Sequence, residues 1–173
     1  MSASPVTPAP LRLRRPAVEA LLARRDRALR ATSARAASVT APVVRTALAV
    51  VMLWFGLPKL VPGGSPAEDL VVRTLDALSG GLVTGDAARL LVSGLEVALG
   101  AALLVGRALP VVLLLLLGHM AGTFAPLVLF PDETWLHPGV GTLEGQYILK
   151  NVVILACVVV LAGQDPARRT RAS

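Results

Sequence analysis

The chain has few charged residues and only one cysteine among its 173 residues. Charged side chains make up 16% of the sequence, whereas soluble domains carry roughly 25%. Hydrophobic residues make up 54%, which is too much apolar mass for a disordered chain. Because Cys157 stands alone, an intramolecular disulfide, a CxxC redox pair and a cysteine-rich metal site are excluded. Together, these shortages indicate a small integral membrane protein.

Positive charge is scarce outside the first 45 residues. The formal net charge is +6, but residues 1–45 carry a net charge of +7 and residues 46–173 a net charge of −1. The first segment holds nine arginines: Arg12, Arg14, Arg15, Arg24, Arg25, Arg27, Arg30, Arg35 and Arg45. A basic segment beside an apolar run is typical of a topology signal or an anionic-lipid contact. We therefore expect a lipid bilayer as a partner, and no nucleic acid.

Four long apolar runs occupy most of the remaining chain. A bilayer core takes about 20 helical residues, and only a helix satisfies its own backbone within one such run. The predicted fold class is all-α, a transmembrane four-helix bundle within residues 42–164. We expect the spans at about 43–62, 88–106, 108–130 and 146–163. A basic tail over 1–41, partly disordered and with a surface helix at 16–31, would precede them, and a basic tail over 165–173 would follow.

The charges between the spans predict their orientation. Arg107 lies between the second and third runs, and Arg168, Arg169 and Arg171 follow the fourth. Residues 131–145 contain no Lys or Arg. By the positive-inside rule, both termini are cytoplasmic and the 62–88 and 131–145 segments lie outside.

The two outer segments differ in their patterns. Ser65-Pro66-Ala67-Glu68 matches a capping box, and apolar residues follow it at helical spacing until Gly80. This pattern predicts an extra amphipathic helix over 66–79 on the outer face of the bundle. Residues 131–139 predict a turn-rich loop, in which Trp135 serves as an interfacial anchor.

Four polar side chains interrupt the apolar runs: Glu96, His119, Lys150 and Asn151. A central charge costs about 2.5–3.5 kcal/mol on insertion scales, so each calls for a partner or a function. At 1.5 Å per residue, Glu96 and Lys150 lie about 9 and 8 Å from the outer ends of their spans. This matched depth predicts a Glu96–Lys150 ion pair, which would either fix helix register or line a functional cavity.

Three other features have simpler interpretations. Lys59 is interpreted as an end residue that extends its ammonium to the interface. Gly118 and Gly122 form a small-xxx-small pattern that predicts close helix approach. His119 is interpreted either as a hydrogen-bonded structural residue or as a proton shuttle.

Four blocks of the sequence resemble the DoxX family of small four-helix membrane proteins. They are LWFGLPK, GLEVALG, HMAGTFAPL and TLEGQYILKN, at residues 53–59, 94–100, 119–127 and 142–151. The resemblance covers about residues 42–163 and implies a compact bundle in the bacterial cytoplasmic (inner) membrane. The family takes its name from a subunit of a thiosulfate:quinone oxidoreductase. The matching blocks contain Lys59, Glu96, His119, Glu144, Lys150 and Asn151.

The function that we expect is that of a DoxX-like membrane subunit of a redox or stress-response system. It would bind a quinone or a small polar ligand among Glu96, His119, Lys150 and Asn151, with Lys59 and Glu144 as further candidates. Any enzymatic role would be that of a subunit of a quinone-linked oxidoreductase with a soluble or membrane redox partner. No catalytic residue, metal site or other cofactor is identified. A small transporter or proton pathway and a structural scaffold that recruits a soluble partner are the alternatives, and a homo-oligomer is compatible with each.

Overall fold

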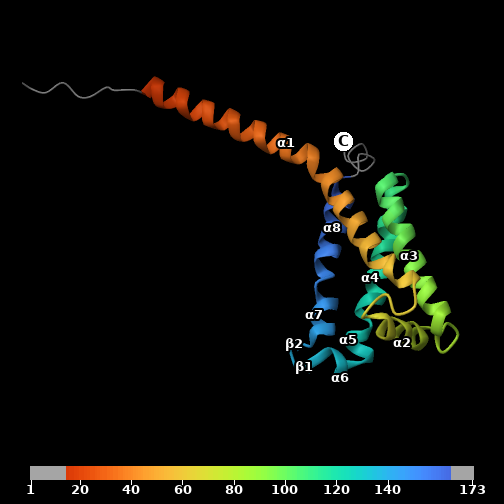
Figure 1. Cartoon of the computed structure of the whole chain (residues 1–173). Coiled ribbons are helices and arrows are strands. Elements are labelled where there is room, and N and C mark those ends of the chain that lie inside the picture. The colour runs from red at the N-terminus through yellow and green to blue at the C-terminus, as the bar shows by residue number, and fades with distance from the viewer. Residues whose placement is uncertain (1–14, 165–173) are drawn as a thin grey trace, which may run out of the picture. The chain divides into compact units, whose positions relative to one another are not determined.

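The computed structural model describes residues 15–164, and within this range most residues are helical (Figure 1). The predicted all-α class is confirmed. A hairpin of two short antiparallel strands, β1 (Trp135–His137) and β2 (Val140–Gly141), is the exception among the described residues. The chain divides between Thr40 and Ala41 into two units. The expected C-terminal tail and the first part of the expected N-terminal tail lie outside the described residues.

The longest helix, α1 (Arg15–Gly56), begins in the first unit and ends in the second. Residues 16–31 are helical as predicted, but they do not form a short helix of their own, because the helix continues to Gly56. Residues 31–41 contain five alanines and neither glycine nor proline, so their helix propensity is high and they continue the helix. Pro42 removes one backbone N–H donor inside α1 without ending it.

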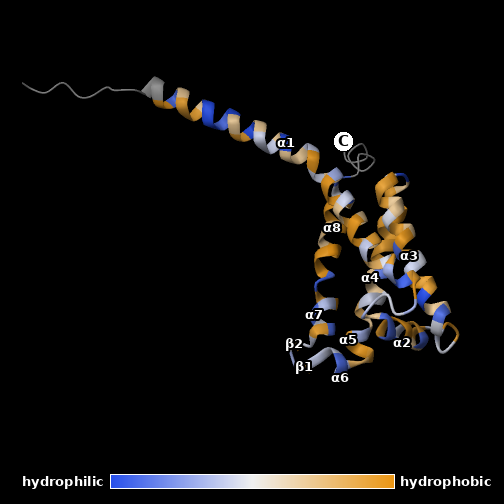
Figure 2. Ribbon diagram, viewed as in Figure 1, coloured by the Kyte–Doolittle hydropathy of each residue, from blue (hydrophilic) through white to orange (hydrophobic). Residues whose placement is uncertain are grey.

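Among the described residues, four helical segments are long and apolar enough to cross a bilayer: Val18–Leu60, Gly85–Val105, Leu109–Leu129 and Leu143–Gly163. The first is α1 with the short 3₁₀ helix η1 (Pro58–Leu60), and the second is α3 (Gly85–Val105). The third joins α4 (Leu109–Phe124) to α5 (Pro126–Leu129), and the fourth joins α7 (Leu143–Leu149) to α8 (Val152–Gly163). In Figure 2, the colour of hydrophobic residues covers most of α8 and much of α3. Such lengths and hydropathies are those of a membrane protein.

The third and fourth spans are interrupted, each for a local reason. Pro126 lacks the N–H that would continue the hydrogen bonds of α4, so α4 ends at Phe124, although Ala125 keeps right-handed helical dihedrals. Lys150 and Asn151 form the turn between α7 and α8. There the Asn151 N–H donates to the Ile148 carbonyl at 2.9 Å and the Val153 N–H to the Lys150 carbonyl at 3.0 Å. These bonds reach back three residues instead of four, which tightens the helix locally.

The core of the second unit lies between α1, α3, α4 and α8, where Leu103, Leu116 and Leu161 are fully buried. Gly100 brings α3 against α1, since a Cβ there would lie 2.7 Å from Leu53 Cγ. The predicted close approach at Gly118 and Gly122 is wrong. No atom of another described element lies within 4 Å of a Cβ built on either glycine.

Helix α2 (Glu68–Ser79) packs against α3 and α5 at one end of the second unit (Figure 1). It begins two residues later than predicted, and the expected capping box does not form. The Ser65 hydroxyl instead accepts the Ala67 N–H at 3.4 Å, and the Glu68 carboxylate accepts the Gly63 N–H at 2.8 Å. Gly80 ends α2 in a left-handed conformation, with φ of 64°.

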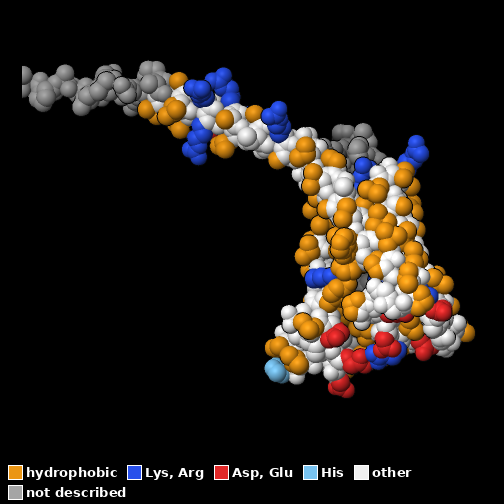
Figure 3. Space-filling model, in the orientation of Figure 1, with side chains coloured by type: hydrophobic (Ala, Val, Ile, Leu, Met, Phe, Trp, Pro, Cys, Tyr) orange, Lys and Arg blue, Asp and Glu red, His pale blue; other side chains and the backbone are white. Residues whose placement is uncertain are grey.

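The expected loop over 131–139 contains α6 (Pro131–Thr134) and the start of the hairpin. The Trp135 indole N–H donates to the Leu127 carbonyl at 3.0 Å, which ties the hairpin to α5. Gly145 allows α7 to pack directly on α6, because a Cβ there would collide with the Thr134 carbonyl. Acidic side chains gather at this end of the second unit in Figure 3.

Candidate functional site

A buried ion pair joins the end of the first span to the second span. Lys59 Nζ donates to both Glu96 carboxylate oxygens, at 2.6 and 2.8 Å. Lys59 is 4% exposed and Glu96 6%, so neither charge reaches the surface of the second unit. The His119 side chain reaches the same carboxylate from α4, with Nε2 3.4 Å from Oε1. Three spans thus meet at one carboxylate.

Two sequence-based predictions about this pair are wrong. The partner of Glu96 is Lys59, not Lys150, and Lys59 does not extend to an interface. The depth argument showed that Glu96 and Lys150 lie at a similar level along their helices. It gave no information on which helices are neighbours. Gly56 supplies the missing constraint, since a Cβ there would lie 2.8 Å from the Glu96 Cβ. Because α1 and α3 touch at this glycine, Lys59 on the next turn is directed at Glu96.

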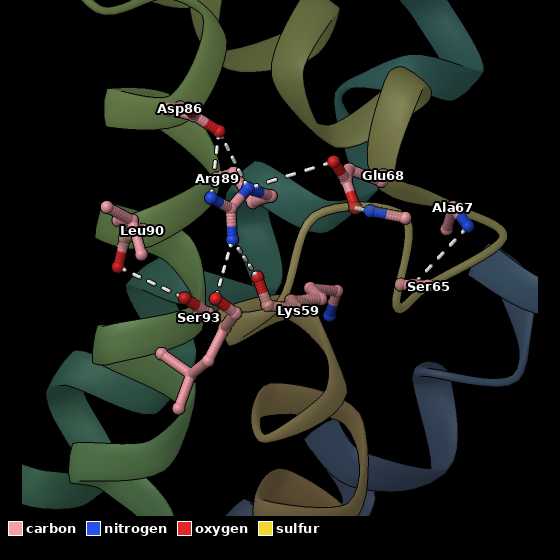
Figure 4. Close-up of polar contacts among 10 residues, drawn as sticks. Lys59, Ser65, Ala67, Glu68, Asp86, Arg89, Leu90 and Ser93 are labelled. Carbon is pink, nitrogen blue, oxygen red and sulfur yellow. Dashed lines mark hydrogen bonds and ion pairs between the residues drawn. The ribbon is translucent and has the colours of Figure 1, made fainter.

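Arg89 holds the backbone that carries Lys59 (Figure 4). Its Nη1 donates to the carbonyls of Lys59 and Leu60, both at 2.8 Å. The Asp86 carboxylate accepts from Arg89 Nη2 at 2.8 Å and from Nε at 3.1 Å, and a Glu68 oxygen lies 3.7 Å from Nε. The guanidinium therefore satisfies carbonyls that the end of α1 and η1 leave without helical partners. Sequence reasoning did not assign Arg89 a role, although it shares a helical stripe with Glu96.

Lys150 lies in a different environment. Its Nζ is 3.6 Å from the centroid of the Tyr147 ring and 4.0 Å from that of Phe55. The two rings meet edge to face, with centroids 5.5 Å apart. Within residues 15–164, no carboxylate lies within ion-pair distance of this ammonium. Aromatic faces attract cations through their quadrupoles, so the rings hold the charge without neutralising it.

Asn151 and Thr123 continue the polar surface beside Lys150. The Asn151 amide donates to the Thr123 hydroxyl at 3.4 Å, and that hydroxyl donates to the Met120 carbonyl at 2.8 Å. The long amide–hydroxyl distance indicates a weak bond. Asn151 thus keeps hydrogen-bonding capacity at the break between α7 and α8.

These polar residues share one pocket of about 240 Å³. Lys59, Glu96, His119, Thr123, Lys150 and Asn151 contribute to one part of its lining. Apolar side chains from α2 and α3 supply much of the remainder: Leu70, Val71, Leu75, Leu78, Leu91, Val92 and Leu95. Gly122 also lines the pocket, so the small residue that was expected to bring helices together leaves space open instead.

Glu144 is the one predicted candidate residue that does not line this pocket. It lies exposed in the first turn of α7. The depth argument did not apply to it, because it precedes the apolar run. Among the described residues, no group of three or more His, Cys, Asp and Glu side chains is placed to hold a metal ion.

A network of ion pairs and hydrogen bonds outside the pocket links α2 to α6. Arg73 on α2 donates to both carboxylate oxygens of Glu133 on α6, at 2.8 and 2.6 Å, and to Asp69 at 2.8 Å. Its guanidinium also lies 4.9 Å from the centroid of the Phe130 ring. Hydrogen bonding from Arg73 lowers the pKa of Glu133 below its usual value. The helix that forms the apolar wall is therefore tied to the end of the third span.

Comparisons with protein-family models, with curated proteins and with solved structures find no match for this chain.

Proposed function

We propose that this chain is an integral membrane protein that binds a small, largely apolar molecule with a polar head in the pocket between its spans. The pocket itself is the observation that carries the proposal. Ligand sites are concave, mostly apolar and supplied with a few polar groups that fix orientation. Here Lys150, Asn151 and His119 would face the head, and the leucines of α2 and α3 would enclose the apolar body.

The proposed role is that of a DoxX-like membrane subunit in a redox or stress-response system. All four sequence blocks that carry the resemblance contribute residues to the pocket lining: Phe55 and Lys59, Leu95 and Glu96, five residues between His119 and Pro126, and Tyr147, Ile148, Lys150 and Asn151. This concentration supports the proposal, because residues that only maintain helix packing would be spread over the core.

A quinone is one ligand that the pocket residues fit. The Lys150 ammonium and the Asn151 amide are donors that suit a quinone carbonyl, and the apolar walls suit its ring. A bound quinone would supply two-electron redox chemistry, with the electrons coming from a partner protein. Within this chain, His119 would hold a proton near the pocket, and its contact with the Glu96 carboxylate would orient the imidazole.

The proposed location is the bacterial cytoplasmic membrane, with both termini in the cytoplasm. Two features support this orientation. Arg107 occupies the exposed turn between α3 and α4, whereas Asp69, Asp76, Asp132 and Glu133 lie at the end formed by α2 and α6. The positive-inside rule assigns the first end to the cytoplasm and the second to the outside.

The contact between Glu96 and His119 favours a second candidate function, a proton pathway through the same residues. A carboxylate beside an imidazole inside a span is a common arrangement in proton relays. This candidate predicts proton flux into vesicles that contain the purified chain, and loss of that flux in Glu96→Gln.

Two glycines of α4 provide a direct test of ligand binding. Gly122 lines the pocket, so a leucine there should occupy part of it, whereas Gly118 does not line it and a Cβ built there meets no neighbour. The full chain in nanodiscs is titrated with a small naphthoquinone and with octanol, with empty nanodiscs as the control for partitioning. We expect Gly122→Leu to weaken binding at least tenfold, about 1.4 kcal/mol, and Gly118→Leu to leave it unchanged. If Gly122→Leu binds every probe as tightly as the unsubstituted chain, the pocket is not a ligand site.

A further inference from the structure

The two lysines of the chain differ in what balances their charge. Lys59 is neutralised by Glu96, which also contacts His119. Lys150 has no acidic partner among the described residues and rests on the rings of Phe55 and Tyr147. The pocket lining therefore holds one carboxylate and two ammonium groups, which give a formal net charge of +1 without counting His119.

An unbalanced ammonium inside an apolar span calls for a counter-ion. Lys150 lies within the span Leu143–Gly163, seven residues from its first residue and so about 10 Å along the helix. Intramembrane charges normally pair with an opposite charge or serve a ligand. The cation–π contacts attract the ammonium but leave its N–H donors without a carboxylate acceptor in the described chain.

The part of the pocket lining that comes from α2 is apolar except for Thr74, whose hydroxyl donates to the Leu70 carbonyl. The α2 residues Leu70, Val71, Leu75 and Leu78 and the α3 residues Leu91 and Leu95 offer no charge and no side-chain hydrogen-bonding group. A molecule in this pocket therefore needs an apolar body as well as a head for Lys150. An apolar cavity of about 150 Å³ holds benzene, so the pocket of about 240 Å³ suits roughly ten non-hydrogen atoms.

We infer that the ligand is an amphipathic molecule with a single negative charge, whose anionic head pairs with Lys150 while its apolar body lies against α2 and α3. This inference rests on the proposed function and narrows its ligand to one chemical class. Asn151 donates a second hydrogen bond to the head, because its amide is only weakly engaged with Thr123. The Lys59–Glu96 pair adds no net charge and does not compete for the anion.

A matched series of eight-carbon probes tests the charge of the head. Octanoate, octanol and octylamine each have eight carbons and carry negative, zero and positive charge, and the slightly shorter alkyl chain of octanoate works against the expected preference. Each is titrated onto the full chain in nanodiscs of zwitterionic lipid, with empty nanodiscs subtracted. We expect octanoate to bind at least tenfold more tightly than octanol, because a hydrogen bond to a charged group is worth about one order of magnitude. Octylamine is expected to bind most weakly.

Substitutions of Lys150 assign this preference to one residue. Lys150→Met should remove the preference for octanoate over octanol, and Lys150→Arg should retain it. Arg107→Met serves as the control, since it removes an exposed cation from the turn between α3 and α4, outside the pocket. The comparison of probes on the unsubstituted chain stands even if a Lys150 variant fails to fold.

The possible outcomes separate this inference from the proposed function. If octanol or naphthoquinone binds and Gly122→Leu blocks it, but octanoate shows no advantage, the pocket is a ligand site and the anionic class is wrong. If Lys150→Met and Arg107→Met reduce octanoate binding equally, octanoate is attracted by the overall positive charge of the protein and not by Lys150. The inference is then also wrong. If no probe binds above empty nanodiscs, both proposals fail.

Discussion

The surroundings of Lys59 and Lys150 teach more about this protein than either residue alone. Both are lysines in apolar segments, and both line the same pocket. The first is closed off by a carboxylate, an imidazole and two tightly packed helices, and its backbone is held by Arg89. The second lies at a break between two helices, where its ammonium contacts two aromatic rings and no carboxylate of the described residues. A charge that is fully partnered stabilises the fold, whereas a charge that is left without an acid is available to a ligand.

Removing one partner of the buried Lys59–Glu96 pair should produce the largest loss of stability among the substitutions considered. Glu96→Gln leaves the Lys59 ammonium buried without a counter-charge, and we expect a loss of about 3–5 kcal/mol in the free energy of unfolding. Lys150→Met removes only cation–π contacts, for which we expect a loss below about 1 kcal/mol. Denaturant-induced unfolding of the purified chain in detergent measures both.

The double variant Lys59→Met with Glu96→Gln controls for the unpaired charge. It should recover much of the stability lost in Glu96→Gln, since replacing both members of a buried pair costs less than leaving one alone. If Glu96→Gln and Lys150→Met reduced the free energy of unfolding equally, the contrast between the two lysines would be contradicted.

A methyl group at Gly56 should have an intermediate effect. In Gly56→Ala the new Cβ would lie 2.8 Å from the Glu96 Cβ and 3.0 Å from the Val97 backbone nitrogen. Separating α1 from α3 should cost about 1–3 kcal/mol and lower the melting temperature. Gly118→Ala is the control, because no neighbouring element restricts that position. A melting temperature of Gly56→Ala equal to that of the control would show that this close contact does not position Lys59.

The exposed pair between Arg73 and Glu133 should show the smallest effect and a dependence on pH. Hydrogen bonding from Arg73 lowers the pKa of Glu133 in the folded chain. Its stabilising contribution is therefore complete above the ordinary glutamate pKa of about 4.3, and it is lost as the pH falls through the lower folded value. The melting temperatures of the unsubstituted chain and Glu133→Gln should differ at pH 7 and converge in acid. A difference that grows on acidification would contradict this assignment.

Much of the polar site could be recognised from sequence, but its connections could not. Glu96, His119, Lys150 and Asn151 stand out because each interrupts an apolar run, and all four line the pocket. Their spacing along single helices carries no information about which helices are neighbours. The pairing of Glu96 with Lys150 failed for that reason. Arg89 was missed because its partners, the carbonyls of Lys59 and Leu60, depend on how the chain turns after α1.

The ends of the helices likewise divide into those set by local residues and those set by contacts with other helices. The start of the span at residue 143 and the end of α4 at Phe124 follow from local groups, since Thr142 caps α7 through the Gly145 N–H and Pro126 has no N–H to extend the hydrogen bonds of α4. The expected capping box at Ser65 failed, because Glu68 bonds to the Gly63 N–H and also approaches Arg89 on α3. A local motif was thus overridden by a neighbouring helix.

Hydropathy along the chain was sufficient to predict an all-α protein with four bilayer-length segments, because the transfer of apolar residues into lipid is nearly additive and independent of partners. The function of each lysine was decided only by packing. Gly56 lets α1 touch α3, which closes the Lys59–Glu96 pair, and the turn at Lys150 and Asn151 places the other ammonium on two rings beside an open pocket. Electrostatic pairing falls off over a few ångströms, so it depends on contacts between helices that no single helix specifies.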